Sequence, residues 1–327
     1  MVSGRSSNVA NGREKNPAGY PHGGRRFPRE RLTFAEIPAV DRRFLNASLF
    51  ILLSVIWGSS FILIKVGLRA LDAYQLASIR ILSAGLVLMP IGLRAFRALP
   101  SEKRLTVAFS GLLGTFIPAY LFCIAETRID SSLAGILNAL TPLFTLGIGA
   151  LAFGHPTGWK HWAGVVLGFA GLAILIFTGA RTISFSNLSY AAFVLLATIC
   201  YGLNVNMVNR HLQGVPSRDI AAIAFSLLIP PALLILWWTD FFSLPWNGTG
   251  FLVSSASGAL LGILGTAFAS VMFYMLLKRA GPLMASMVTY GIPFVAIFWG
   301  LVAGEGITPM QTAGLVVILG GVYLAHD

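Results

Sequence analysis

Two prolines within apolar stretches of the chain could open a binding site inside a membrane. Pro142 lies four residues after Asn138, and Pro293 lies four residues after Thr289. A proline has no N–H group, so in a helix the carbonyl four residues earlier loses its partner and must find another one in hydrocarbon. Because each freed carbonyl belongs to a residue with a polar side chain, we expect these four residues to border a bound substrate. In the alternative interpretation, the prolines only kink their helices.

Four further side chains could contact the same molecule. Trp57 and Tyr290 could stack on it or hydrogen-bond to it, although aromatic side chains are also ordinary packing groups. Arg80 lies well inside an apolar stretch, where a charge usually faces water, a partner or an anionic group of a substrate. Lys65 ends its apolar stretch, so extension of its ammonium to the membrane interface is the alternative to substrate binding.

The other reactive side chains do not form a recognised catalytic or metal-binding pattern. The five histidines are dispersed and form no HExxH motif, no GxSxG motif occurs, and the two cysteines lie in apolar stretches without CxxC spacing. We therefore predict no catalytic residue, no metal site and no cofactor. An intramembrane lipid-modifying enzyme and a channel are two functions that these residues leave open.

The twelve acidic residues fall in the first 43 residues, in loops or at helix ends, so no carboxylate is expected in the middle of the membrane. Glu126 and Glu305 lie nearest to the apolar stretches. We interpret both as solvated loop charges, with a proton relay as the alternative.

The composition indicates which elements position these residues. Hydrophobic residues make up 56% of the chain and charged residues 11%, with a mean hydropathy of +0.78, which excludes an ordinary soluble domain. Apolar stretches long enough to cross a bilayer follow one another along the chain. Arg80 interrupts the second of them, and the series is 44–64, 74–93, 105–125, 131–159, 161–180, 182–208, 220–239, 241–277, 280–304 and 306–326. We expect an all-α polytopic membrane protein with ten transmembrane helices.

The net charge of +11 comes from basic residues that flank these stretches, so nucleic acid is not an expected partner. Beyond residue 43, nine basic residues fall in the loops of one side and three in those of the other. The positive-inside rule then places both termini in the cytoplasm. We expect the protein to lie in the inner membrane. Residues 1–43 are rich in Gly, Pro and Arg, and we expect a disordered, basic cytoplasmic tail.

An internal repeat relates the two halves of the chain. Gly111-Leu-Leu-Gly114-Thr115 matches Gly262-Ile-Leu-Gly265-Thr266 at an offset of 151 residues (262 − 111 = 151), and Pro142 matches Pro293 at the same offset. Five helices in each copy, an odd number, mean that the second copy enters the bilayer from the opposite side. We therefore predict two inverted five-helix repeats, residues 44–180 and 182–325, as in secondary transporters.

Several motifs resemble those of a known family. Trp57-Gly58-Ser59-Ser60-Phe61 with Lys65, Leu76-Ala77-Ser78-Ile79-Arg80, the two proline-bearing helices and Gly304-Glu305 are similar to patterns of the EamA family of the drug/metabolite transporter superfamily. The first repeat departs from it, because Gly154-His155 stands where the family commonly has Gly-Glu.

This resemblance implies a secondary transporter that moves a small metabolite, such as an amino acid, a related metabolite or a drug, across the cytoplasmic membrane by alternating access. Export is the implied direction. The expected partners are the small-molecule substrate and membrane lipid, and the expected assembly is a monomer or a homodimer.

Overall fold

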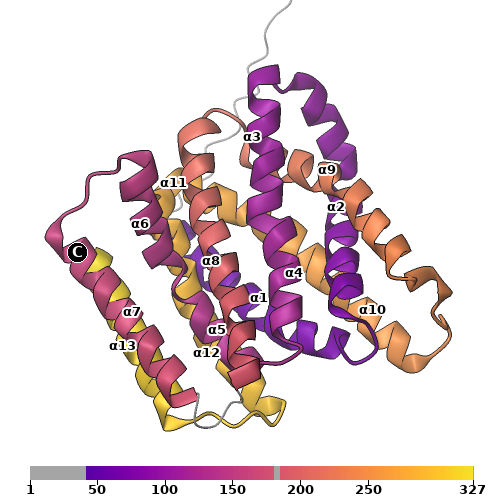
Figure 1. The fold of residues 1–327 in the computed structure, drawn as a ribbon. Coiled ribbons are helices and arrows are strands. Elements are labelled where there is room, and N and C mark those ends of the chain that lie inside the picture. The colour runs from indigo at the N-terminus through magenta and orange to yellow at the C-terminus, as the bar shows by residue number, and fades with distance from the viewer. Residues whose placement is uncertain (1–41, 180–184, 327) are drawn as a thin grey trace, which may run out of the picture. The chain divides into compact units, whose positions relative to one another are not determined.

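Helices form all the regular structure in the part of the chain that the structure, a computed structural model, describes: residues 42–179 and 185–326 (Figure 1). The first half contains α1 (Arg42–Gly67), α2 (Ala73–Ala98), α3 (Ser101–Gly111), η1 (Leu112–Phe116), α4 (Ile117–Ala125), α5 (Ser131–Asn138), α6 (Thr141–Phe153) and α7 (Trp159–Gly179). The second half contains α8 (Phe185–His211), α9 (Ser217–Trp238), η2 (Phe241–Ser243), α10 (Thr249–Gly262), η3 (Ile263–Phe268), α11 (Ala269–Ser286), η4 (Met287–Tyr290), α12 (Gly291–Val302) and α13 (Pro309–His326). The all-helical prediction is confirmed for these residues. The predicted tail lies outside them except for its last two residues, which begin α1.

Seven helical stretches in the described residues are long and apolar enough to cross a membrane. One of them, Thr249–Val302, has 54 residues and is interrupted at Gly281, whose φ of 86° and ψ of 172° only glycine adopts readily. Two shorter apolar helices, Trp159–Leu175 and Pro309–Ala325, accompany the seven stretches. The chain is therefore a multi-pass membrane protein.

Local sequence signals define the ends of the helices near the site. Asp72 begins α2 with a capping box, in which its carboxylate accepts hydrogen bonds from Tyr74 N and Gln75 N, both at 2.8 Å, and the Gln75 side chain accepts from Asp72 N. After α12, Gly304 has a φ of 81°, and the N–H of Glu305 donates to the Gly300 carbonyl at 2.8 Å. This turn directs Glu305 back toward the helices.

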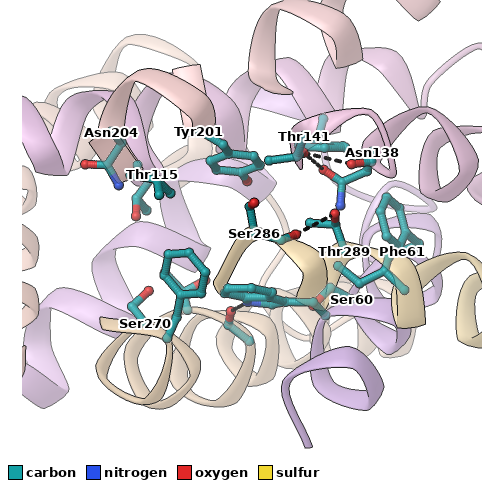
Figure 2. Close-up of a pocket in the computed structure, with 18 of the residues that line it drawn as sticks. Ser60, Phe61, Thr115, Asn138, Thr141, Tyr201, Asn204, Ser270, Ser286 and Thr289 are labelled. Atoms are coloured by element: carbon teal, nitrogen blue, oxygen red, sulfur yellow. Dashed lines mark hydrogen bonds between the residues drawn. The ribbon is translucent and has the colours of Figure 1, made fainter. Parts of the chain in front are cut away.

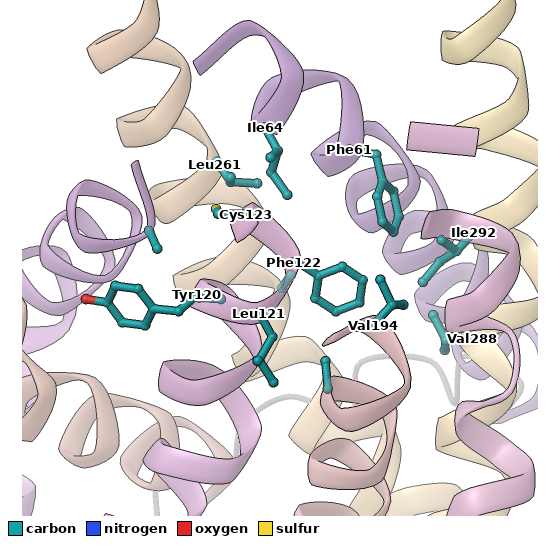
Figure 3. Packing of buried hydrophobic residues seen from close by; sticks show 14 of the residues in the cluster. Phe61, Ile64, Tyr120, Leu121, Phe122, Cys123, Val194, Leu261, Val288 and Ile292 are labelled. Carbon is teal, nitrogen blue, oxygen red and sulfur yellow. The ribbon is translucent and has the colours of Figure 1, made fainter. Parts of the chain in front are cut away.

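Small residues allow helices of the two halves to pack closely. Helix α2 packs along α9, and α7 packs along α13 (Figure 1). A side chain at Gly164 of α7 would overlap the Gly321 carbonyl of α13, so the two backbones touch there. Apolar side chains fill the interior next to the site, where the rings of Phe61 and Phe122 meet edge to face with centroids 5.7 Å apart (Figure 3).

Candidate functional site

A cavity of about 90 Å³ lies between helices of both halves. In the first half, α1, α2, η1, α4, α5 and α6 line it, and in the second half α8, η3, α11, η4 and α12 do so. Two helices contribute side chains with the same spacing: Trp57, Ser60 and Phe61 from α1, and Tyr201, Asn204 and Val205 from α8. This spacing of three and four residues places each set on one helix face. The cavity is thus built from corresponding faces of the two halves.

The repeated Gly-Leu/Ile-Leu-Gly-Thr motif forms a π-helical turn in each half, η1 and η3, and both turns border the cavity. A π turn interrupts the regular hydrogen-bond ladder and is common at functional sites. In η3, the Gly265 carbonyl accepts a hydrogen bond from Trp57 Nε1 at 2.8 Å, and Thr266 Oγ1 accepts one from Arg80 Nε at 2.7 Å. The second-half turn therefore holds two side chains of the first half.

The helix breaks at the two prolines also border the cavity. Helix α5 ends at Asn138 and α6 begins at Thr141, whose hydroxyl donates to the Asn138 carbonyl at 2.7 Å (Figure 2). In the second half, the Thr289 hydroxyl donates to the Ser286 carbonyl at 2.8 Å. All four of these polar residues line the cavity.

The prolines themselves do not line the cavity. Pro142 is the second residue of α6 and Pro293 the third of α12, and both are buried. In the first turn of a helix a missing N–H leaves no bond unmade. Their contribution is to begin the second helix of each broken pair.

Among the described residues that line the cavity, Arg80 is the one with a charged side chain. It is buried, with 9% of its surface exposed, and forms no ion pair among the described residues. A guanidinium has five N–H donors, and Thr266 accepts one of them. An unpaired cation inside a membrane protein is costly unless it faces water or an anionic group, so Arg80 can bind a carboxylate in the cavity.

Aromatic rings and neutral polar groups form the rest of the wall. The Trp57 and Phe273 ring centroids lie 5.2 Å apart, and the Tyr274 hydroxyl is within hydrogen-bond distance of Ser110 Oγ at 3.0 Å. Asn204 Nδ2 donates to the Tyr274 hydroxyl at 3.4 Å, while its Oδ1 is buried without a partner among the described residues. Such a wall suits a small molecule with an apolar part and a few polar groups.

Trp57, Arg80, Asn138 and Thr289 of the predicted site line the cavity, whereas Lys65, Tyr290, Pro142 and Pro293 do not. The ring of Tyr290 packs against the apolar interior, and its buried hydroxyl has no partner among the described residues.

Sequence reasoning missed most of the second-half lining residues: Tyr201, Thr266, Ser270, Phe273, Tyr274 and Ser286. The repeated motif that ends in Thr115 and Thr266 was a usable signal, because both of its threonines border the cavity.

Two carboxylates outside the apolar stretches are buried, so their interpretation as solvated loop charges was wrong. Glu305 is 7% exposed and Glu126 is 8% exposed. The turn at Gly304 directs the Glu305 carboxylate to Lys65 Nζ, 2.5 Å away. The same carboxylate accepts hydrogen bonds from the backbone N–H groups of Ser131 and Ser132 at 3.2 and 3.1 Å. Burial acts to raise the pKa of Glu305, but these hydrogen bonds outweigh it and lower the pKa below its ordinary value.

A protein-family model decides the family. The model of the EamA-like transporter family matches residues 45–177 and 188–326. The chain belongs to the EamA-like transporter family. Two matched segments in one chain indicate duplicated halves, and a transporter family confirms the prediction that the protein is not an enzyme.

Individual relatives cover most of the chain. An uncharacterized inner membrane transporter of Escherichia coli, YedA, is 27% identical over 277 residues, which are 83% of this chain and 87% of the relative. A protein of Salmonella typhimurium named as a probable amino-acid metabolite efflux pump is 28% identical, over 84% of this chain and 93% of its own. A crystal structure with 19% sequence identity superposes with a TM-score of 0.61 over 86% of this chain and 96% of that chain, which shows the same fold.

Proposed function

We propose that this EamA-family protein is a secondary transporter that exports a small metabolite bearing a carboxylate, such as an amino acid, across the inner membrane by alternating access. The observation that carries the proposal is Arg80, a buried cation on the cavity wall that lacks a carboxylate partner among the described residues. The names of two relatives, an uncharacterized inner membrane transporter and a probable amino-acid metabolite efflux pump, support the location and the substrate class.

We further propose ten transmembrane helices in two inverted repeats, with both termini in the cytoplasm. Six of the seven long apolar stretches each supply one transmembrane helix, and the 54-residue stretch supplies two because Gly281 divides it. Helices α7 and α13 are the remaining two of the ten. Corresponding faces of α1 and α8 line the cavity, which supports a pathway between two related halves. The conformations open to either side would then have similar energies, as alternating access requires.

Counterflow in proteoliposomes tests this function. Vesicles loaded with an unlabelled amino acid are expected to accumulate the same labelled amino acid transiently, with saturation. Arg80→Gln removes a charge-assisted hydrogen bond worth about 1.5–3 kcal/mol, so we expect the apparent affinity for the carboxylate to fall about 10- to 150-fold. Arg97→Gln on the exposed part of α2 is the matched control and should leave the affinity unchanged.

Two results would contradict this function. Flux without saturation or counterflow would indicate a channel. Equal affinities of Arg80→Gln and Arg97→Gln for a carboxylate substrate would remove Arg80 from the binding site.

A further inference from the structure

At one end of the cavity, an ion pair and two backbone hydrogen bonds to the same carboxylate link three parts of the fold, and we call this arrangement the Lys65–Glu305 tie. Lys65 of α1 follows Ile64, which lines the cavity, and its ammonium bonds to Glu305 in the loop between α12 and α13. The Glu305 carboxylate also accepts hydrogen bonds from the N–H groups of Ser131 and Ser132, the first two residues of α5. The carboxylate of Glu305 therefore joins α1, α5 and this loop just beyond the cavity wall.

A second carboxylate, Glu126, is buried beside this tie. It follows the last residue of α4, one turn after Phe122 of the cavity wall. Its Oε2 accepts a hydrogen bond from Ser131 Oγ at 2.8 Å, while its Oε1 is buried without any partner among the described residues. Ser131 thus bonds to both carboxylates, through its N–H to Glu305 and through its hydroxyl to Glu126.

The charges around Glu126 do not balance a second negative charge in this place. The ammonium of Lys65 is already bonded to Glu305, and Arg80 of α2 lies on the cavity wall with Thr266. Asp130, which precedes α5, is an exposed acidic group and supplies no positive charge either. Cys123, on the last turn of α4, also interacts with Glu126, and its thiol is not a cation. Arg128, two residues after Glu126, has an exposed side chain.

Electrostatics agrees with this geometry. Burial raises the pKa of Glu126 well above its ordinary value, and repulsion from Glu305 adds to the effect. The hydrogen bond from Ser131 and the charges of Lys65 and Arg80 oppose the increase without cancelling it. In this arrangement, burial and the nearby charge of Glu305 favour the protonated form of Glu126.

We propose that Glu126 is the proton-binding residue of this transporter, and that its protonation keeps the Lys65–Glu305 tie closed at this end of the cavity. When the proton leaves to water, two neighbouring carboxylates are both charged, and the Glu126 oxygen without a partner must be hydrated. Water reaches it only if α4 and α5 separate at this end. Deprotonation therefore favours the state open at this end.

The sign of the pH dependence follows from this linkage. The closed state binds the proton more tightly than a hydrated open state does, so the closed state is favoured at low pH. This preference is lost as the pH rises above the ordinary carboxyl pKa and through the raised pKa of Glu126. In the proposed exporter, on which this inference rests, the end faces the outside, where an incoming proton would close it.

Labelling of a cysteine in the cavity wall tests the proposal without any substrate. The reporter Ile64→Cys is placed in the full chain after Cys123→Ala and Cys200→Ala, and the protein is held in lipid nanodiscs. The rate of labelling by a water-soluble maleimide is measured from about pH 5 to about pH 9 in two reporter proteins, one with Glu126 and one with Glu126→Gln. The ratio of the two rates cancels the titration of the reporter thiol itself.

We expect the rate with Glu126, divided by the rate with Glu126→Gln, to rise at least about fivefold with pH, because glutamine resembles the protonated acid. Asp130→Asn, a neighbouring exposed acid, is the matched control and should keep this rise. Ser131→Ala removes a hydrogen bond that lowers the pKa of Glu126, so it should move the rise to higher pH. A purely structural role of Ser131 would not shift the midpoint.

A ratio that stays constant across this pH range would overturn the proposal, and so would the same loss of pH dependence in Asp130→Asn. These outcomes are independent of the counterflow experiment. A transporter can exchange a carboxylate substrate while its labelling ratio is flat, and this result would reject only the role of Glu126.

Discussion

The ion pair between Lys65 and Glu305 offers the sharpest test of how the two halves are held together. The perturbations are Lys65→Gln, Glu305→Gln and the double variant, compared as a double-mutant cycle. The side chain of Glu305 is 2% exposed, whereas that of Lys65 is 38% exposed. The pair is therefore neither fully buried nor fully solvated, and its energy should lie between the two limits.

The magnitude follows from these exposures. Breaking a fully buried pair costs about 3–5 kcal/mol, and an exposed pair contributes about 0–1 kcal/mol. Because water screens the ammonium of Lys65, we expect a coupling energy of about 1–2 kcal/mol. Glu305→Gln alone should cost about 2–3 kcal/mol, since the N–H groups of Ser131 and Ser132 also lose a charged acceptor.

Reversible unfolding in mixed detergent micelles measures these free energies. Asp130→Asn is the matched control, because this residue is exposed and its side chain does not cap α5, and it should change stability by less than about 0.5 kcal/mol. The pKa of Glu305 is lowered, so its contribution is present above the ordinary carboxyl pKa and is lost as the pH falls through the lowered value. A coupling energy below about 0.3 kcal/mol would refute the reasoning.

Three further predictions use other contacts. Gly164→Ala should lower the free energy of unfolding by about 1–3 kcal/mol, because a methyl group there meets the α13 backbone. Gly320→Ala is the control and should leave that free energy unchanged, because open space surrounds Gly320. Trp57→Phe removes the hydrogen bond to η3 and should slow counterflow at least about threefold, whereas an unchanged rate would show that this bond is dispensable. Asn206→Ala should cost about 0.6–1.7 kcal/mol of unfolding free energy, because the buried amide bonds to carbonyls of α6 and α8.

Much of the architecture follows from local properties of the sequence. Apolar stretches, glycines and prolines act on the backbone where they stand, so the all-helical membrane fold, the family and the helix breaks before Pro142 and Pro293 could be predicted. The count of ten helices and their inverted arrangement remain predictions. Arg80 was recognised because a charge within an apolar stretch is unusual wherever the chain places it.

The tertiary structure alone decided which groups meet. Lys65 and Glu305 are 240 residues apart, and Thr266 is 186 residues from Arg80, so no local pattern could pair them. Glu126 and Glu305 read as solvated loop charges in sequence, yet the turn at Gly304 and the start of α5 bury both carboxylates beside one lysine. Burial and the sharing of a partner depend on what packs around a residue, and these two properties set its charge state.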